Sequence, residues 1–242
     1  KLCRAPYEQV SHFFPILKHV LSMVKNRPSC YSDCIVNGRL KFEKYFNHNP
    51  KQLLFLLPLN HTVKEGNEEK PFWVLPKVAP SPIIFDLKDK LHLSFVVSFA
   101  QIEAFVWRLK VERDINVEEV LKNVKVSQFV AKKGKKVETD PNKKKKQVEE
   151  EENNDKKNEE EMKKEFIQIV GKVVDALKNV DSDTSTTVVV EFEKDDDSNA
   201  HIDFITAASS LRSVMYKIKP ENRLETKRIA GRIAPAIATT TS

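Results

Sequence analysis

The chain has 242 residues, and 40% of them are hydrophobic, which is enough to build a core for one large or two small domains. Its formal net charge of +6 comes from lysine blocks that alternate with glutamate blocks, so the total does not indicate a nucleic-acid surface. No apolar run approaches the roughly 18 to 20 residues that cross a bilayer, and the first residues lack the build of a signal peptide. These features predict neither a membrane span nor a signal peptide. We expect a soluble piece of a longer protein.

The first third of the chain shows helical spacing of apolar residues. The segment Val10 to Lys25 has its apolar side chains three or four residues apart, at Phe13, Phe14, Leu17, Val20, Leu21 and Val24. Ser32 and Asp33 are capping residues for a second helix that runs toward Asn47. Pro50 then precedes a short helix at 52–57. Three helices are therefore predicted before residue 60.

A proline-rich stretch separates these helices from a fourth. The four prolines of Pro71 to Pro82 predict an extended segment. Residues 93–109 are again amphipathic, and their predicted buried side consists of Phe95, Val96, Phe99, Ile102, Phe105 and Val106.

The middle of the chain is dominated by charge. Between Lys132 and Lys164, lysine and glutamate blocks follow each other with hardly an apolar residue. Such a segment cannot repay the entropy of ordering, so we predict a disordered insertion over 131–164. The run Lys143 to Lys146 is either part of this flexible linker or a localisation signal.

Periodic structure resumes after the insertion. A helix is predicted over 166–177, and the β-branched run Thr186 to Phe192 predicts a short strand that Asp195 to Ser198 ends. A helix begins at His201, and a last short one opens at Pro220 and ends before Gly231. The predicted class is mainly α with little strand. The boundaries are 1–130 for a first helical part, 131–164 for the insertion, 165–231 for a second helical part and 232–242 for a crossing to another domain.

The cysteines indicate free thiols. Cys30 and Cys34 are four residues apart on a predicted helix, and none of the six histidines stands at a ligand spacing from them, so no metal site is predicted. An odd cysteine count favours a reducing compartment, which indicates the cytoplasm, with the nucleus as a further location. Cys3 has Arg4 beside it, and a cation can lower a thiol pKa, but one arginine is a weak signal for a nucleophile.

Two long motifs near the C-terminal end are more specific than any of these patterns. Residues 192–205 read F-E-K-D-D-D-S-N-A-H-I-D-F-I, and residues 235–241 read P-A-I-A-T-T-T. Both resemble ubiquitin-activating enzymes, where the first motif lies in the half-domain that houses the catalytic cysteine. The second marks the return to the adenylation domain. Shorter runs resemble the type that also charges a tandem ubiquitin-like modifier: R-L-K-F-E-K-Y-F at 39–46, P-F-W at 71–73, P-S-P-I-I-F-D at 80–86 and L-H-L-S-F at 91–95.

The resemblance implies a helical catalytic-cysteine half-domain of an enzyme that adenylates ubiquitin or a ubiquitin-like modifier with MgATP. That enzyme carries the modifier as a cysteine thioester and passes it to a conjugating enzyme. The five glycines contain no G-x-G-x-x-G turn, so no cofactor is expected in this fragment and the ATP site is expected elsewhere in the parent protein. The Cys-Thr pair of the family's nucleophile is also absent, so the fragment is predicted to be inactive alone.

The candidate catalytic residues are Asp195, Asp196 and Asp197. Adjacent carboxylates before a helix are explained either by capping and the helix dipole or, as the resemblance implies, by one of them lying close to the thioester. Supporting candidates are Asn199 and His201, the latter as an acid or base near neutral pH or as a packed residue. Arg223, Lys227 and Arg232 match basic family positions near the crossing, and they either anchor the half-domain to the adenylation domain or form solvated surface.

Three functions remain open at this stage. The first is a part of a ubiquitin-activating enzyme, with the modifier, a conjugating enzyme and the parent's adenylation domain as partners, and with neither nucleic acid nor membrane. The second is a non-catalytic interaction module derived from this half-domain. The third is a nucleic-acid adaptor built on the lysine run, which would require salt-dependent binding.

Overall fold

The computed structural model describes residues 7–65, 68–112, 114–132, 155–178 and 187–240. Within these ranges regular structure is helical except for an antiparallel pair, β1 (Thr62–Glu65) and β2 (Glu68–Pro71), so the predicted mainly α class is confirmed. The chain divides into two compact units, of which one holds α1 and α6 and the other holds the remaining elements. Each unit is described below by itself.

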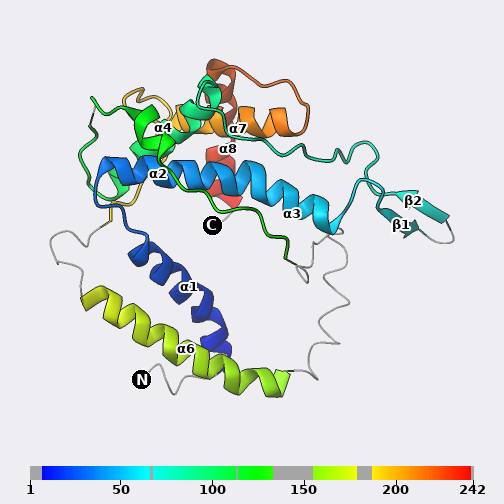
Figure 1. Ribbon diagram of the computed structural model, residues 1–242, viewed down its shortest axis with the longest axis vertical. Helices are drawn as coiled ribbons and strands as arrows, with labels where there is room; N and C mark the ends of the chain where they lie inside the picture. The colour runs from blue at the N-terminus through cyan, green and yellow to red at the C-terminus, as the bar shows by residue number, and fades with distance from the viewer. Residues whose placement is uncertain (1–6, 66–67, 113, 133–154, 179–186, 241–242) are drawn as a thin grey trace. The chain divides into compact units, whose positions relative to one another are not determined.

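The first unit is a pair of helices, α1 (Tyr7–Lys25) and α6 (Asp155–Lys178), which pack against each other (Figure 1). The apolar face of α6 is formed by Phe166, Ile169 and Val173, which are buried at helical spacing. Phe14 of α1 contributes a ring whose centroid lies 6.5 Å from that of Phe166. The helix predicted over 10–25 is confirmed, but its partner is a distant segment. The predicted first part, 1–130, is thus divided between the two units.

The charged insertion is shorter than predicted. Residues 133–154, with the Lys143 to Lys146 run, lie outside the described residues, but residues 155–164 form the first turns of α6. The sequence places Glu159 and Glu160 four residues before Lys163 and Lys164, the order and spacing that stabilise a helix. The helix that carries the apolar face therefore begins within the charged stretch, at Asp155, and the predicted start at residue 166 was wrong.

The second unit is built around α4 (Lys90–Val106), which packs against both α2 (Tyr31–Phe42) and α7 (His201–Met215). The ring of Phe42 lies 5.9 Å from that of Phe95, and Phe95 lies 5.4 Å from Phe204 of α7. Aromatic contacts therefore link the three helices in one core. Gly38 permits the close approach, because a Cβ there would lie 2.8 Å from the carbonyl oxygen of Val96.

A break in the helix before Pro50 was predicted, but the helix that begins as α2 does not break there. It continues as a π-helical turn, η2 (Glu43–His48), and then as α3 (Asn49–Leu56). Proline has no N–H for the carbonyl four residues earlier, which belongs to Phe46. The N–H of Ile83 donates to that carbonyl at 2.8 Å. The π-helical turn therefore accommodates Pro50, and the carbonyl of Phe46 still accepts a hydrogen bond.

The predicted extended segment Pro71 to Pro82 is non-helical and leads into a loop fixed on three sides. The N–H of Ser81 donates to the carbonyl of Met215, that of Ile83 to Phe46, and that of Asp86 to Nδ1 of His92. The P-S-P-I-I-F-D run thus holds η2, α4 and the end of α7 together. A short helix, α5 (Val117–Lys122), covers α2.

Several local predictions were wrong. The residue before α2 is Cys30, which forms no side-chain cap, while Asp33 accepts a hydrogen bond from the N–H of Ser29. The described part of the predicted strand, 187–192, is not a strand, because no strand among the described residues lies beside it to supply the ladder. The last helix, α8 (Arg223–Thr240), passes Gly231 and residue 235, so helix covers most of the predicted crossing at 232–242.

Substituting Gly38 tests the close approach of α2 and α4. Gly38→Ala is expected to lower the free energy of unfolding by about 1 to 3 kcal/mol, because the new methyl group overlaps backbone that cannot move aside. Urea unfolding followed by the fluorescence of Trp73 and Trp107, both in the second unit, measures it. Gly171→Ala in α6 is the matched control, since nothing lies within 4 Å of its new methyl group. An unchanged midpoint for Gly38→Ala would contradict the packing.

Candidate functional site

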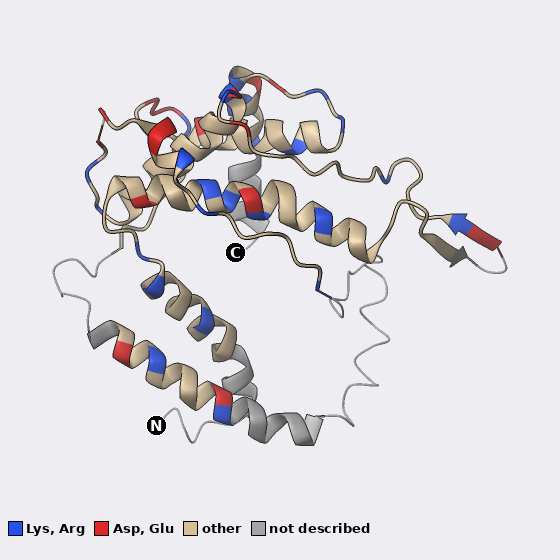
Figure 2. Cartoon of the chain, in the orientation of Figure 1, with Lys and Arg blue, Asp and Glu red and all other residues tan. Residues whose placement is uncertain are grey.

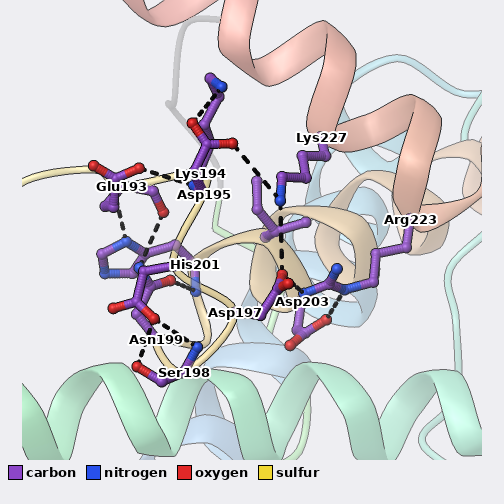
Figure 3. A network of polar contacts seen from close by, with 12 residues as sticks. Glu193, Lys194, Asp195, Asp197, Ser198, Asn199, His201, Asp203, Arg223 and Lys227 are labelled. Carbon is purple, nitrogen blue, oxygen red and sulfur yellow. Dashed lines mark hydrogen bonds and ion pairs between the residues drawn. The ribbon is translucent and has the colours of Figure 1, made fainter.

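The acidic loop 192–200 joins an exposed segment to the start of α7 and lies beside α8 (Figure 3). α8 packs against α7, with Thr226 buried, and the loop is exposed beside the two helices. Figure 2 shows that lysine, arginine and acidic residues are spread along the ribbons of both units, and Figure 3 shows those that contact one another at the loop. The structure therefore brings together most of the residues that the sequence singled out.

Arg223, at the start of α8, connects the loop to α7. Its Nε donates to Oδ1 of Asp203 at 2.6 Å, and its Nη2 donates to Oδ1 of Asp197 at 3.0 Å. The Arg223 hydrogen bond lowers the pKa of Asp197, and the two carboxylates, Asp203 first, raise the pKa of Arg223. A guanidinium that spans two carboxylates fixes their spacing better than an amine could.

Lys227 lies one turn along α8 and adds a second cation. Its Nζ is 3.7 Å from Oδ1 of Asp195 and 3.7 Å from Oδ1 of Asp197. Lys194 donates to Oδ2 of Asp195 at 2.6 Å, and this bond is the main reason why the pKa of Asp195 is lowered. Two of the three aspartates are therefore paired with cations and connect the loop to α8.

Asp196 is different. Its Oδ1 accepts hydrogen bonds from the N–H and the hydroxyl of Ser198, at 2.8 and 2.6 Å, and these bonds lower its pKa. Within the described residues, no lysine or arginine pairs with it. Because the lowered pKa keeps it ionised at neutral pH, Asp196 can attract a positive group or accept a proton, but it does not store one to donate.

Asn199 and His201 brace the inner side of the loop. The Asn199 amide donates to the carbonyl of Glu193 at 3.0 Å, and its oxygen accepts from the N–H of His201. Nδ1 of His201 accepts from the N–H of Glu193 at 3.1 Å, and the imidazole stacks on Phe192. Because Nδ1 is occupied, His201 holds the loop in the structure, and only Nε2 is available for other contacts.

The loop lines one side of a cavity of about 750 Å³. The opposite side is the C-terminal part of α4, including Phe105, and the chain after it. Phe105 was predicted to be buried but is 58% exposed, because the packed face of α4 turns away from it toward Ala100 and Ala104. Nothing in the helical spacing of residues 93–109 distinguishes these two faces.

The two described cysteines are free and lie at the start of α2, where Cys30 is exposed and Cys34 is buried. Burial raises the pKa of Cys34 to about 12, with the nearby Glu103 as a further cause. Cys34 is therefore a protonated core residue. Cys3 lies outside the described residues. No cluster of potential metal ligands occurs in the described part of the chain, and none of its helices combines the length and apolar character that crossing a bilayer requires.

Sequence reasoning selected most of this cluster but missed Glu193 and Lys194, whose hydrogen bonds shape the loop. Their position beside the three aspartates, in the run E-K-D-D-D, was the available signal. Arg232 lies further along α8, exposed, at the edge of a small cavity that Lys194 and Lys227 also line. It extends the basic side of α8 beyond the aspartates.

Comparison with known proteins shows the family. Residues 5–227 match the family model described as ubiquitin-activating enzyme, SCCH domain. Over 227 residues, 92% of the chain, it is 43% identical to the mouse ubiquitin-like modifier-activating enzyme 6 and 42% identical to the human protein of that name. It is 39% identical over 222 residues to ubiquitin-activating enzyme E1 1 of Schizosaccharomyces pombe. The chain spans about a fifth (20%) of the length of each of these relatives.

Removing the bridging arginine tests the electrostatics of the loop. Arg223→Gln is expected to raise the pKa of Asp197 toward its ordinary value, because the strongest stabilisation of the carboxylate is lost. A depressed carboxyl pKa contributes stability that is present above the unfolded pKa and lost as pH falls through the folded pKa, so the variant lacks this contribution at neutral pH. NMR titration of the side-chain carboxyl carbon measures the pKa of Asp197 in both proteins. Arg212→Gln on α7 is the control, since Arg212 contacts Tyr216. An Asp197 titration unchanged by Arg223→Gln would refute the bridge.

The two described thiols are expected to react very differently. At pH 8, iodoacetamide should modify Cys30 in the folded chain and leave Cys34 unmodified, because Cys34 is buried and protonated. Both should react in urea. Peptide mapping by mass spectrometry separates the two sites, and equal labelling of both in the folded chain is the outcome that would count against a buried Cys34.

Proposed function

Because the chain belongs to the ubiquitin-activating enzymes, as their SCCH or second catalytic-cysteine half-domain, we propose that it works as one part of a thioester-forming enzyme. The parent protein adenylates ubiquitin or a ubiquitin-like modifier with MgATP and carries it on a cysteine. It then passes the modifier to a conjugating enzyme. The observation that carries the role of this part is the acidic loop, in which two of the three aspartates pair with cations and Asp196 pairs with no lysine or arginine of the described residues.

The reaction assigned to the parent is acyl transfer. The cysteine sulfur forms a bond to the modifier's terminal carbonyl carbon, the bond from that carbon to the phosphate of the adenylate breaks, and AMP leaves. The thiol proton passes to a base or to water. In this chain no glycine-rich turn is available for phosphates, and no Cys-Thr pair occurs in its sequence. Adenylation and the nucleophile are therefore assigned to other parts of the parent.

Within this scheme the three aspartates divide their roles. Asp195 and Asp197 hold the loop against α8 through Lys227 and Arg223, and Lys194 of the loop also pairs with Asp195. Asp196 faces the cavity and remains ionised, so we assign it the contact with the reacting centre, where it orients a proton-bearing group. The ion pairs are positioning contacts, which keep Asp196 in place.

Substitution of Asp196 separates this assignment from a structural one. Asp196→Asn in the full-length parent is expected to slow thioester formation at least about tenfold, because the amide keeps the shape but loses the charge. Fluorescent ubiquitin, MgATP and single-turnover sampling on non-reducing gels give the rate. Asp114→Asn, an exposed aspartate of the same unit, is the control. The 242-residue chain alone is expected to form no thioester from pre-formed ubiquitin adenylate.

The same experiment addresses the interaction module. The pairing of Asp195 and Asp197 with cations also suits a purely structural loop. A parent protein that binds conjugating enzymes but never forms a thioester with ubiquitin or a ubiquitin-like modifier would establish the module in place of the enzyme.

A further inference from the structure

The cavity beside the acidic loop has an apolar floor that is open to solvent. α4 ends at Val106, and Arg108 takes a left-handed conformation (φ 54°) that turns the chain, so Leu109 and Val111 line the same cavity as Phe105. Val189 lines the opposite wall and is 86% exposed. Exposed apolar side chains that converge on one cavity are typical of an interaction site.

The segment that forms this wall has the composition of a strand but pairs with no strand in the part of the chain that the structure describes. The N–H of Val188 donates to the carbonyl of Val106 at 2.9 Å, which attaches the segment to the end of α4. For residues 189–192, no backbone hydrogen bond to another described backbone group is present. A β-branched run with free backbone groups at the surface can pair with an incoming extended chain.

The rim of the cavity is acidic, and its carboxylates are not neutralised by described lysine or arginine residues. Glu191, Glu193 and Asp196 all line it, and within the described residues none of the three forms an ion pair with a lysine or arginine. The neighbouring Asp195 and Asp197, by contrast, are paired with cations of α8 and the loop. The side of the loop that faces the cavity therefore presents unneutralised negative charge beside an apolar floor.

We propose that this cavity, defined here as the α4 groove, binds an extended segment of the conjugating enzyme that receives the modifier. The segment carries apolar side chains for the floor and lysine or arginine for the rim. This assignment rests on the proposed function. A loaded modifier is already held by its covalent bond, whereas the acceptor arrives from solution and needs a non-covalent surface beside the thioester. Complementary charge at the rim would also raise its rate of encounter.

Two substitutions in the groove test the proposal in the full-length parent. Val189→Asp and Glu191→Lys are each expected to raise the KM for the conjugating enzyme about tenfold, because one removes an apolar contact and the other reverses a rim charge. Ile84→Asp and Glu221→Lys are matched controls, since Ile84 is 78% exposed and Glu221 is exposed outside the groove. Transfer of fluorescent ubiquitin from the parent to the conjugating enzyme gives the KM. Salt should raise the KM of the original protein more than that of Glu191→Lys.

The formation of the parent's own thioester is measured separately, without conjugating enzyme. If the groove variants slow this loading step while the KM for the conjugating enzyme stays the same, the groove serves the modifier and the proposal is overturned. An unchanged KM with unchanged loading overturns it as well.

A binding measurement keeps the groove distinct from the proposed function. Fluorescein-labelled ubiquitin-conjugating enzymes are titrated with the full-length parent, and anisotropy gives the Kd whether or not a thioester forms. If the parent forms no thioester but Glu191→Lys still lowers its affinity for the conjugating enzyme about tenfold, the α4 groove is supported and the proposed function is rejected. Equal Kd values for the original protein and both groove variants would reject the groove whatever the activity.

Discussion

The second unit depends on the burial of α4 between α2 and α7. Phe42, Phe95 and Phe204 form a continuous aromatic contact through these helices, and Gly38 lets α2 approach the backbone of α4. Because α7 is fixed by this core, its first residue, His201, has a fixed position too. The acidic loop ends at His201, so the core determines where the three aspartates lie. Packing far from the loop is thus a condition for its geometry.

Several segments that resemble the family most closely are structural. The R-L-K-F-E-K-Y-F run supplies Phe42 and Phe46 to the core and an Arg39–Glu43 ion pair of 2.8 Å. The P-S-P-I-I-F-D run supplies the hydrogen bond that satisfies the carbonyl opposite Pro50. The F-E-K-D-D-D-S-N-A-H-I-D run differs from these, since its acidic side chains are exposed and line a cavity beside α4. A family motif therefore does not by itself identify a functional residue, since core packing restricts sequence as strongly as chemistry does.

Within the acidic loop, charge neutralisation separates three adjacent residues of the same type. Arg223 and Lys227 come from α8, which follows the loop by more than twenty residues, and of the three adjacent aspartates they contact Asp195 and Asp197 but not Asp196. Asp196 points to the other side, toward Ser198 and the α4 groove. The loop thus has a neutralised side that holds it and a negative side that remains available.

The sequence by itself determined the family, the mainly helical class, the start of α7 and the group of acidic and basic residues at the site, because these follow from local spacing and from long motifs. Tertiary structure decided the rest. The pairing of α1 with α6, the π turn at Pro50 and the unpaired run at 187–192 depend on which distant segments meet. The exposure of Phe105 and the different surroundings of Asp196 do so too, since a residue's burial and partners are set by contacts that helical periodicity does not encode.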